Sequence, residues 1–259
     1  MTRTAISPRL AIKIFCSTGG NTVAVATPIE TPPADQPDWP PGWHVSVVDE
    51  TGSTNADLLL AAASGAPDRT VLVARHQTTG RGRLERRWEA PTGLNLLVSI
   101  LFRDVPTQPH MLTQRVALAA LVACDRVGGV KPTLKWPNDL VIDGMKLAGI
   151  LAQAERDVVV VGLGLNVGWA PVGAIRLGAG IDPLRVLREV LVAYDELPTD
   201  PWSQYREHMG TIGRRVRVEL PSATVSGRAL NVEHDGRLLV VDDAGVKHRF
   251  DVGDVVHMR

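Results

Sequence analysis

The chain has 259 residues, which is long enough for one large hydrophobic core or two unequal ones, and we expect two. Lys plus Arg equals Asp plus Glu at 28 each, so no overall field recruits DNA, RNA or an anionic membrane, and any anion site must be local. The 2 cysteines are too few for a disulfide framework or a four-ligand zinc site, and residues 10–26 fall short of the roughly 20 uninterrupted apolar residues of a membrane span. These features predict a cytoplasmic protein.

Residues 1–42 show no sustained hydrophobic period, and the segment 28–41 is rich in proline. Such a composition is typical of an extended linker or a disordered tail. No helix-turn-helix pattern occurs there, so we expect no DNA-binding module. Order should begin near Trp43.

Strands and helices then follow one another along the chain. The alternation in HVSVVDE (44–50) predicts a strand, after which Ser53 or Thr54 should cap a helix that runs to residue 64. Further strands are expected at 70–77, 94–102, 134–136, 139–142, 147–155 and 158–167, and a helix from Met111 to Val127. Because hairpin turns connect several of these strands, we predict an α+β fold with a mixed β-sheet and packed helices.

The sequence pattern changes in the last third of the chain. Residues 182–209 predict two helices broken at Pro198 to Pro201, and five short alternating segments follow Thr211. These segments predict a small SH3-like β-barrel. The expected domains are therefore 43–210 and 211–259, after a tail of residues 1–42.

The segment GRGRLERRW (80–88) joins two predicted strands. Glycines let its backbone approach a ligand, and its arginines offer forked donors to phosphate or carboxylate oxygens. The arginines are Arg81, Arg83, Arg86 and Arg87. An isolated arginine-rich turn is equally consistent with a solvated surface hairpin.

The segment LKWPND (134–139) ends in turn-forming residues that carry oxygen atoms. Lys135 is placed to meet an α-phosphate, and the carboxylate of Asp139 is a hard ligand suited to Mg²⁺. Lys146 leads into the next apolar strand, where it either pairs with a ligand carboxylate or stays a solvated charge. By itself, the segment is also compatible with a plain turn.

The segment GLGLN (162–166) ends the run of four valines. Alternating glycines leave one face of the strand bare, so a flat ligand can lie on the backbone. The spacing is not that of a dinucleotide-binding fingerprint, and no P-loop or G-x-S-x-G motif is present. Nucleophilic catalysis by the protein is therefore not expected.

In chain order, GSTN (52–55), HQTTGRGR…RRW (76–88), KWPND (135–139), KLAGIL (146–151) and GLGLN (162–166) closely resemble the biotin protein ligases. The resemblance spans residues 43–259, including the small barrel. It implies the class II synthetase-like biotin/lipoate ligase catalytic domain. Residues 1–42 do not match the DNA-binding domain of bifunctional members, so the resemblance implies a ligase without a repressor role.

The resemblance implies a role for each motif. Biotin should contact Ser53, Thr54, Asn55, Gln77, Arg81, Gly82, Arg83 and Lys146. The nucleotide should contact Arg86, Trp88, Asn138 and Asn166, with Trp88 stacking on adenine. Lys135, Arg83 and Lys146 are the expected catalytic residues, and Asp139 the expected Mg²⁺ ligand.

The family reaction implies ATP and Mg²⁺ as cofactors and biotin as the substrate. Biotin is activated as biotinyl-5′-AMP and transferred to a lysine of the biotin carboxyl carrier domain of acyl-CoA carboxylases. We expect no DNA or membrane partner, and a monomer or weak homodimer. The alternatives are a lipoate or octanoate ligase or transferase, which shares the fold, and a degraded ligase that binds without turnover.

The chain departs from the family pattern in two places. Position 85 carries Glu where the family has Gly, so a backbone that needs positive φ there would be strained. Residues 168–183 lack the Thr-Ser-Leu turn common in relatives, which leaves the surroundings of Asn166 open.

Overall fold

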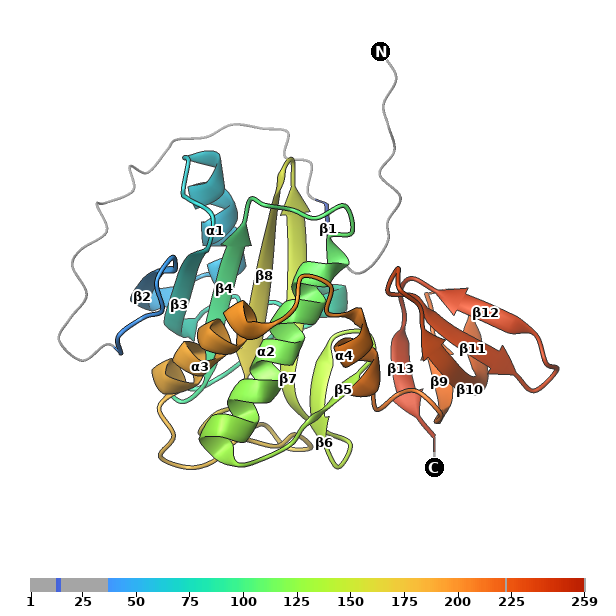
Figure 1. The fold of residues 1–259 in the computed structure, drawn as a ribbon. Coiled ribbons are helices and arrows are strands. Elements are labelled where there is room, and N and C mark those ends of the chain that lie inside the picture. Colours follow the sequence, from blue (N-terminus) through green and yellow to red (C-terminus); the bar gives the residue numbers. More distant parts are fainter. Residues whose placement is uncertain (1–12, 15–36, 222, 259) are drawn as a thin grey trace, which may run out of the picture.

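The computed structural model describes residues 13–14, 37–221 and 223–258, which form a large mixed sheet with helices and a small all-β unit (Figure 1). The large sheet runs in the order β2-β3-β4-β8-β7-β6-β5, with β1 paired to β7. Its strands are β1 (Lys13–Ile14), β2 (His44–Thr51), β3 (Thr70–Gln77), β4 (Leu96–Phe102), β5 (Thr133–Lys135), β6 (Asp139–Ile142), β7 (Met145–Glu155) and β8 (Val158–Leu165). The β2–β3 pair is parallel, and the ladder from β3 to β5 is antiparallel, so the sheet is mixed as predicted.

Helices cover both faces of this sheet. The helices are α1 (Thr54–Ala63), α2 (His110–Gly128), α3 (Pro183–Glu196) and α4 (Trp202–Glu207). Successive side chains of a strand point to opposite faces, and the valines of β8 follow this rule. Val159 and Val161 lie in the main core with α2 and α3, whereas Val158 and Val160 pack with Leu58 of α1.

On the α1 face, β8 changes from valine to glycine. Gly162 and Gly164 continue the row of Val158 and Val160 beyond the N-terminus of α1. The valine half of the row binds α1, and the glycine half leaves room above the backbone. This change of residue size positions the site described below.

The C-terminal unit is a five-stranded antiparallel sheet in the order β12-β11-β10-β9-β13. Its strands are β9 (Arg215–Glu219), β10 (Thr224–Val232), β11 (Leu238–Asp242), β12 (Lys247–Phe250) and β13 (Asp254–His257). It packs on the large unit, since Val216 and Val240 belong to the same apolar cluster as Trp136. The indole Nε1 of Trp136 also donates to the Gly236 carbonyl at 3.1 Å.

The predicted elements agree with the structure, with differences at their ends. The strand expected at 94–102 begins at Leu96, and the strand expected at 134–136 ends at Lys135. Ser53 occupies the N-cap position of α1, but its side chain makes no capping hydrogen bond. Within the predicted tail, Lys13–Ile14 forms β1 and residues 37–42 are described, and the rest of the tail prediction lies outside the described residues.

Candidate active site

A cavity of about 500 Å³ lies on the glycine face of the large sheet. It is bounded by the start of α1, the segment 80–88, the turn after β5, and the strands β9 and β13 of the small sheet. Every site residue expected from the sequence lines it: Ser53, Thr54, Asn55, Gln77, Arg81, Gly82, Arg83, Arg86, Trp88, Lys135, Asn138, Asp139, Lys146 and Asn166. The structure thus brings together five motifs that are separated by up to about a hundred residues in the chain.

The first turn of α1 is held by neighbouring strands. The backbone N–H of Thr54 donates to Gln77 Oε1 at 2.8 Å, and Thr54 Oγ1 lies 2.6 Å from Ser99 Oγ. Ser99 was not predicted from the sequence, because a serine inside an apolar strand carries no motif. It fixes the orientation of the side chains at the floor of the cavity.

Asn55 is 6% exposed, and its amide is fully engaged. Its Nδ2 donates to Gln153 Oε1 at 2.8 Å and to the Leu151 carbonyl at 3.2 Å, and its Oδ1 accepts from Ser99 Oγ at 2.5 Å. The bare backbone at Gly162 makes room for this amide. Asn55 therefore links α1, β4 and β7 at the wall of the cavity.

The flat group that lies against the glycines is the indole of Trp88. A Cβ built on Gly164 would stand 2.5 Å from Cε2 of the indole, and one on Gly149 would stand 3.2 Å from Cζ3. The Lys146 ammonium lies 5.5 Å from the ring centroid, and the buried Nε1 of Trp88 has no hydrogen-bond partner. One side of the ring is thus supported by backbone.

The segment 80–88, here called the arginine loop, is folded as a small hairpin. Gly82 N–H donates to the Arg86 carbonyl at 2.7 Å, and Trp88 N–H donates to the Gly80 carbonyl at 3.0 Å. Arg83–Glu85 forms a single 3-10 turn, which the sequence did not predict. The left-handed residue of the loop is Leu84 (φ 53°, ψ 44°), one position before the Glu85 at which strain was considered.

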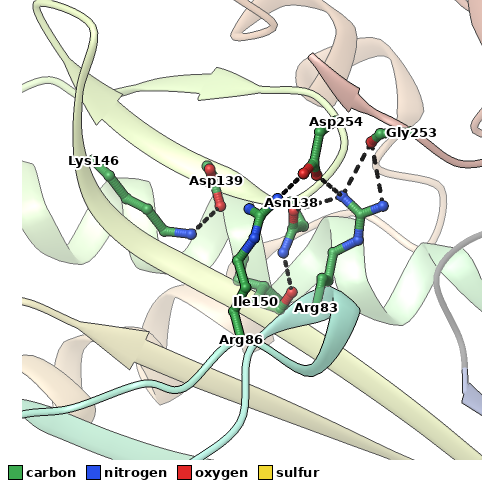
Figure 2. Close-up of polar contacts among 8 residues, drawn as sticks. All are labelled: Arg83, Arg86, Asn138, Asp139, Lys146, Ile150, Gly253 and Asp254. Atoms are coloured by element: carbon green, nitrogen blue, oxygen red, sulfur yellow. Dashed lines mark hydrogen bonds and ion pairs between the residues drawn. The ribbon is translucent and has the colours of Figure 1, made fainter. Parts of the chain in front are cut away.

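The arginine loop reaches both units of the structure, as Figure 2 shows. Arg83, whose side chain is 9% exposed, donates to Asn138 Oδ1 at 3.3 Å and to the Gly253 carbonyl at 3.3 and 3.2 Å. Arg86 forms an ion pair with Asp254. Burial lowers the pKa of the Arg83 guanidinium, and the Asp139 carboxylate opposes that change.

The turn after β5 presents two polar side chains. Asn138 Nδ2 donates to the Ile150 carbonyl at 2.7 Å, which fixes its Oδ1 toward Arg83. Asp139 Oδ1 lies 2.6 Å from Lys146 Nζ (Figure 2). Half-buried Lys135 has a pKa lowered by burial and by Lys146 and Arg86, against the effect of Asp139. Lysine and arginine side chains outnumber aspartate and glutamate side chains in the lining of the cavity. Such an excess of positive charge suits a polyanionic ligand.

Asn166 lines the cavity, but its amide is used by the protein. It is 2% exposed, its Nδ2 donates to the Ile175 carbonyl at 3.2 Å, and its Oδ1 accepts from Asn95 Nδ2 at 3.3 Å. These bonds hold the segment after β8, which is the part of the chain that departs from the family pattern. Asn166 thus shapes the cavity by ordering that segment.

The sequence did not indicate that the small sheet contributes to the site. Glu219, Asp254, Val255 and Val256 line the same cavity. Their position depends on how the two units pack, and no local sequence pattern predicts that packing. Among the described residues, no three His, Cys, Asp or Glu side chains gather as a metal site, and no helix is long and apolar enough to cross a membrane.

Matches to two family models place the chain among the ligases. Residues 47–168 match the biotin/lipoate A/B protein ligase family, and residues 211–258 match the biotin protein ligase C-terminal domain. The chain belongs to the biotin protein ligases.

Individual relatives support this assignment. The chain is 41% identical over 242 residues to the biotin--[acetyl-CoA-carboxylase] ligase of Mycobacterium tuberculosis, covering 84% of this chain and 91% of that one. It is 30% identical to the bifunctional ligase/repressor BirA of Bacillus subtilis, covering 80% and 72%. Among solved structures it resembles the biotin protein ligase from Aquifex aeolicus in complex with biotin and ATP, with a TM-score of 0.71, 25% identity, and coverage of 83% and 99%.

Proposed function

We propose that the cavity between α1, the glycine face and the arginine loop is where this ligase joins biotin to AMP and then to a carrier lysine. The chain is an ATP-dependent biotin–protein ligase that forms biotinyl-5′-AMP and transfers biotin to the carrier domain of biotin-dependent carboxylases. The observation that carries the site assignment is the convergence of Arg83, Arg86, Lys135 and Lys146 on one cavity, where the Trp88 indole lies on the glycine face of the sheet. A planar ring system and a charged phosphate chain fit these two surfaces.

The uncharged end of the cavity suits biotin. Ser53, Thr54 and Gln77 present hydroxyl and amide groups there, and Ser99 holds Thr54 and Asn55 in place behind them. Such groups can pair with the ureido ring, whose donors and acceptors would otherwise be buried unsatisfied. The Trp88 indole and Gly149 bound the path of the biotin side chain toward Lys146.

The cationic end suits the nucleotide. Lys135, Arg83 and Arg86 surround the space beside Asn138, and Trp88 offers a ring for adenine to stack on. Arg81 and Gly82 complete the wall where the two ends meet. Asn166 supports this wall through the loop it orders.

In the first step, a biotin carboxylate oxygen attacks the α-phosphorus of ATP, a new O–P bond forms, and pyrophosphate leaves. Lys146 orients the carboxylate, and Lys135 and Arg83 neutralise charge that grows on the phosphoryl oxygens. Fixed cations of this kind are worth roughly 10² to 10³ in rate for each donor removed. The protein supplies no nucleophile of its own.

Asp139 and the phosphate oxygens fit a magnesium ion. Mg²⁺ is usually held by one or two carboxylates together with substrate phosphates and water. One protein carboxylate, that of Asp139, is therefore enough. When bound, the ion withdraws charge from the phosphate oxygens. Asp139 would exchange its ion pair with Lys146 for this role, which frees the ammonium for biotin.

In the second step, the amine of the carrier lysine attacks the acyl carbon, an amide forms, and AMP leaves with the bonding electron pair. The intermediate is a mixed anhydride that water hydrolyses, so the site must exclude water until the carrier arrives. The arginine loop and the strands β9 and β13 form the wall on that side.

We further propose the domain boundaries 43–210 and 211–259 after a tail of residues 1–42, and action in the cytoplasm as a monomer or weak homodimer without DNA. The equal numbers of acidic and basic residues support the absence of DNA binding, and the paucity of cysteine supports the cytoplasm. Sedimentation velocity at micromolar concentration, with and without biotin and ATP, measures the oligomeric state.

Incubating the protein with biotin, Mg·ATP and a purified carrier domain tests the function. Pyrophosphate should appear, biotinyl-5′-AMP should be detectable without carrier, and the carrier should gain the mass of one biotinyl group. Lipoate in place of biotin should give no pyrophosphate. Biotin binding without pyrophosphate release would identify a binding module instead, and pyrophosphate with lipoate would identify a lipoate ligase.

A further inference from the structure

The start of β13 brings a carboxylate of the small sheet to the arginine loop. Asp254 lies between the two guanidinium groups of Arg83 and Arg86, and the Gly253 carbonyl lies beside it (Figure 2). The loop and β13 are about 170 residues apart in sequence. No sequence motif singles out Asp254, because its role depends on this contact between the units.

The contact is built from several interactions at once. Arg83 Nη1 lies 3.6 Å from Asp254 Oδ1, and Arg86 pairs with the other oxygen of the same carboxylate. Arg83 also donates twice to the Gly253 carbonyl. Gly253 has φ +145°, which side-chain-bearing residues rarely adopt, so glycine is required for this carbonyl to face the loop.

The burial of Arg83 separates its contact with Asp254 from the surface pairs of the small sheet, whereas Arg86, the other partner of Asp254, is 63% exposed. Asp254 is 23% exposed and Arg83 9%, whereas the pair Arg215–Asp243 is 51% and 69% exposed. Exposed pairs are screened by water and contribute little, but a half-buried cation that loses its partner is costly. Arg83 and Arg86 also repel each other. The Asp254 carboxylate contacts both guanidinium groups, where its charge opposes that repulsion.

Because the reactive anhydride must be sheltered, the position of the loop matters most after the first step. We infer that Asp254, together with the Gly253 carbonyl, is a positioning residue that fastens the arginine loop to the small sheet and so retains biotinyl-5′-AMP in the cavity. This inference rests on the proposed function. Asp254 acts through Arg83 and Arg86, and the small sheet is thereby a working part of the active site.

The test compares Asp254→Asn with Asp251→Asn in the full chain. Asp251 is a matched control, because it lies three residues away and pairs with Arg237 at 2.6 Å, within the small sheet. Each protein is loaded with biotin and Mg·ATP without carrier, and the rate at which biotinyl-5′-AMP leaves the protein is measured after rapid removal of free ligand. Labelling of lysines on an added bystander protein reports the same release.

We expect Asp254→Asn to release the adenylate at least tenfold faster and to label the bystander more. Asp251→Asn should match the unchanged protein within twofold, and Asp254→Glu should restore much of the retention. Equal release from the Asp254→Asn and unchanged proteins would overturn the inference. Equal acceleration in both Asn variants would also overturn it, since that points to general loosening of the small sheet.

A second readout needs no ligand and separates failure of the inference from failure of the proposed function. Trypsin cleaves after arginine, and the loop offers Arg81, Arg83, Arg86 and Arg87. Without ligand, Asp254→Asn should be cut in the loop at least fivefold faster than Asp251→Asn at an equal thermal midpoint. An unchanged protein that makes no adenylate contradicts the proposed function, whereas equal cleavage of the two variants contradicts the role of Asp254.

Discussion

The indole of Trp88 lies against Gly164, so that a Cβ at residue 164 would stand 2.5 Å from ring atom Cε2. The loop and the sheet therefore pack closely at residue 164, where a residue larger than glycine has no room. The ring position in turn fixes one wall of the path between the biotin and nucleotide ends of the cavity.

Gly164→Ala should weaken retention of biotinyl-5′-AMP at least tenfold, equivalent to about 1.4 kcal/mol, because the added methyl group displaces the indole. Titration with a non-hydrolysable adenylate analogue measures this. In a Trp88→Ala background, Gly164→Ala should cost less than threefold further. A full additional loss in that background would mean that the glycine contacts the ligand rather than the indole.

Replacing Asn55 should lower the stability of the fold as well as ligand binding. Asn55→Ala removes three hydrogen bonds and leaves Ser99 and Gln153 without this partner in a buried place, so the free energy of unfolding should fall by about 1–3 kcal/mol. Urea unfolding followed by circular dichroism measures it. Ser64→Ala, which removes an exposed hydroxyl bond at the other end of α1, should change stability by no more than about 0.5 kcal/mol.

Much of the site could be predicted because its chemistry is carried by short motifs. Glycine, arginine and turn-forming residues are recognisable in short local patterns. The arginine loop, the turn at 135–139 and the glycine strand can therefore be located from the sequence alone. The strand at 44–50 and the C-terminal strands were predicted from alternation, whereas β4 and β8 were predicted from short apolar runs.

What the sequence did not predict depends on packing between distant segments. Ser99 and Gln153 acquire their roles only when β4 and β7 lie beside α1. Asp254 becomes a site residue only when the small sheet packs against the loop. Likewise, the left-handed backbone at Leu84 arises from closure of the hairpin, and leucine gives no local signal for it.

The position of that left-handed residue sharpens the expectation for Glu85. Since φ is positive at Leu84, backbone strain does not distinguish glycine from glutamate at position 85 in this structure, and the charge is the remaining difference. Glu85→Gly and Glu85→Gln should therefore both slow adenylate release, to a similar extent of about two- to fivefold. Dissociation rates measured side by side decide this, and slowing by glycine alone would restore the argument from strain.

His257 connects the stability of the small sheet to pH. Burial, together with Lys135 and Arg214, lowers its pKa to about 4. Its Nε2 lies 3.0 Å from Thr211 Oγ1, which accepts from the Trp136 N–H at 3.0 Å. Since the Thr211 hydroxyl can then donate to Nε2, the neutral imidazole fits this chain of bonds.

The sign of the pH effect follows from the lowered pKa. Between about pH 4 and the usual value of 6.5, the unfolded chain binds a proton at residue 257 that the folded chain does not, so the free energy of unfolding should rise with pH across this window. His257→Asn should make that rise shallower in urea unfolding between pH 4.5 and 7. Some slope should remain, because burial also lowers the pKa of His110, and removing both histidines should reduce it further. An unchanged slope in His257→Asn would show that His257 binds a proton equally in the folded and unfolded states. Its Nε2–H would then donate to Thr211 Oγ1, which still accepts from the Trp136 backbone N–H.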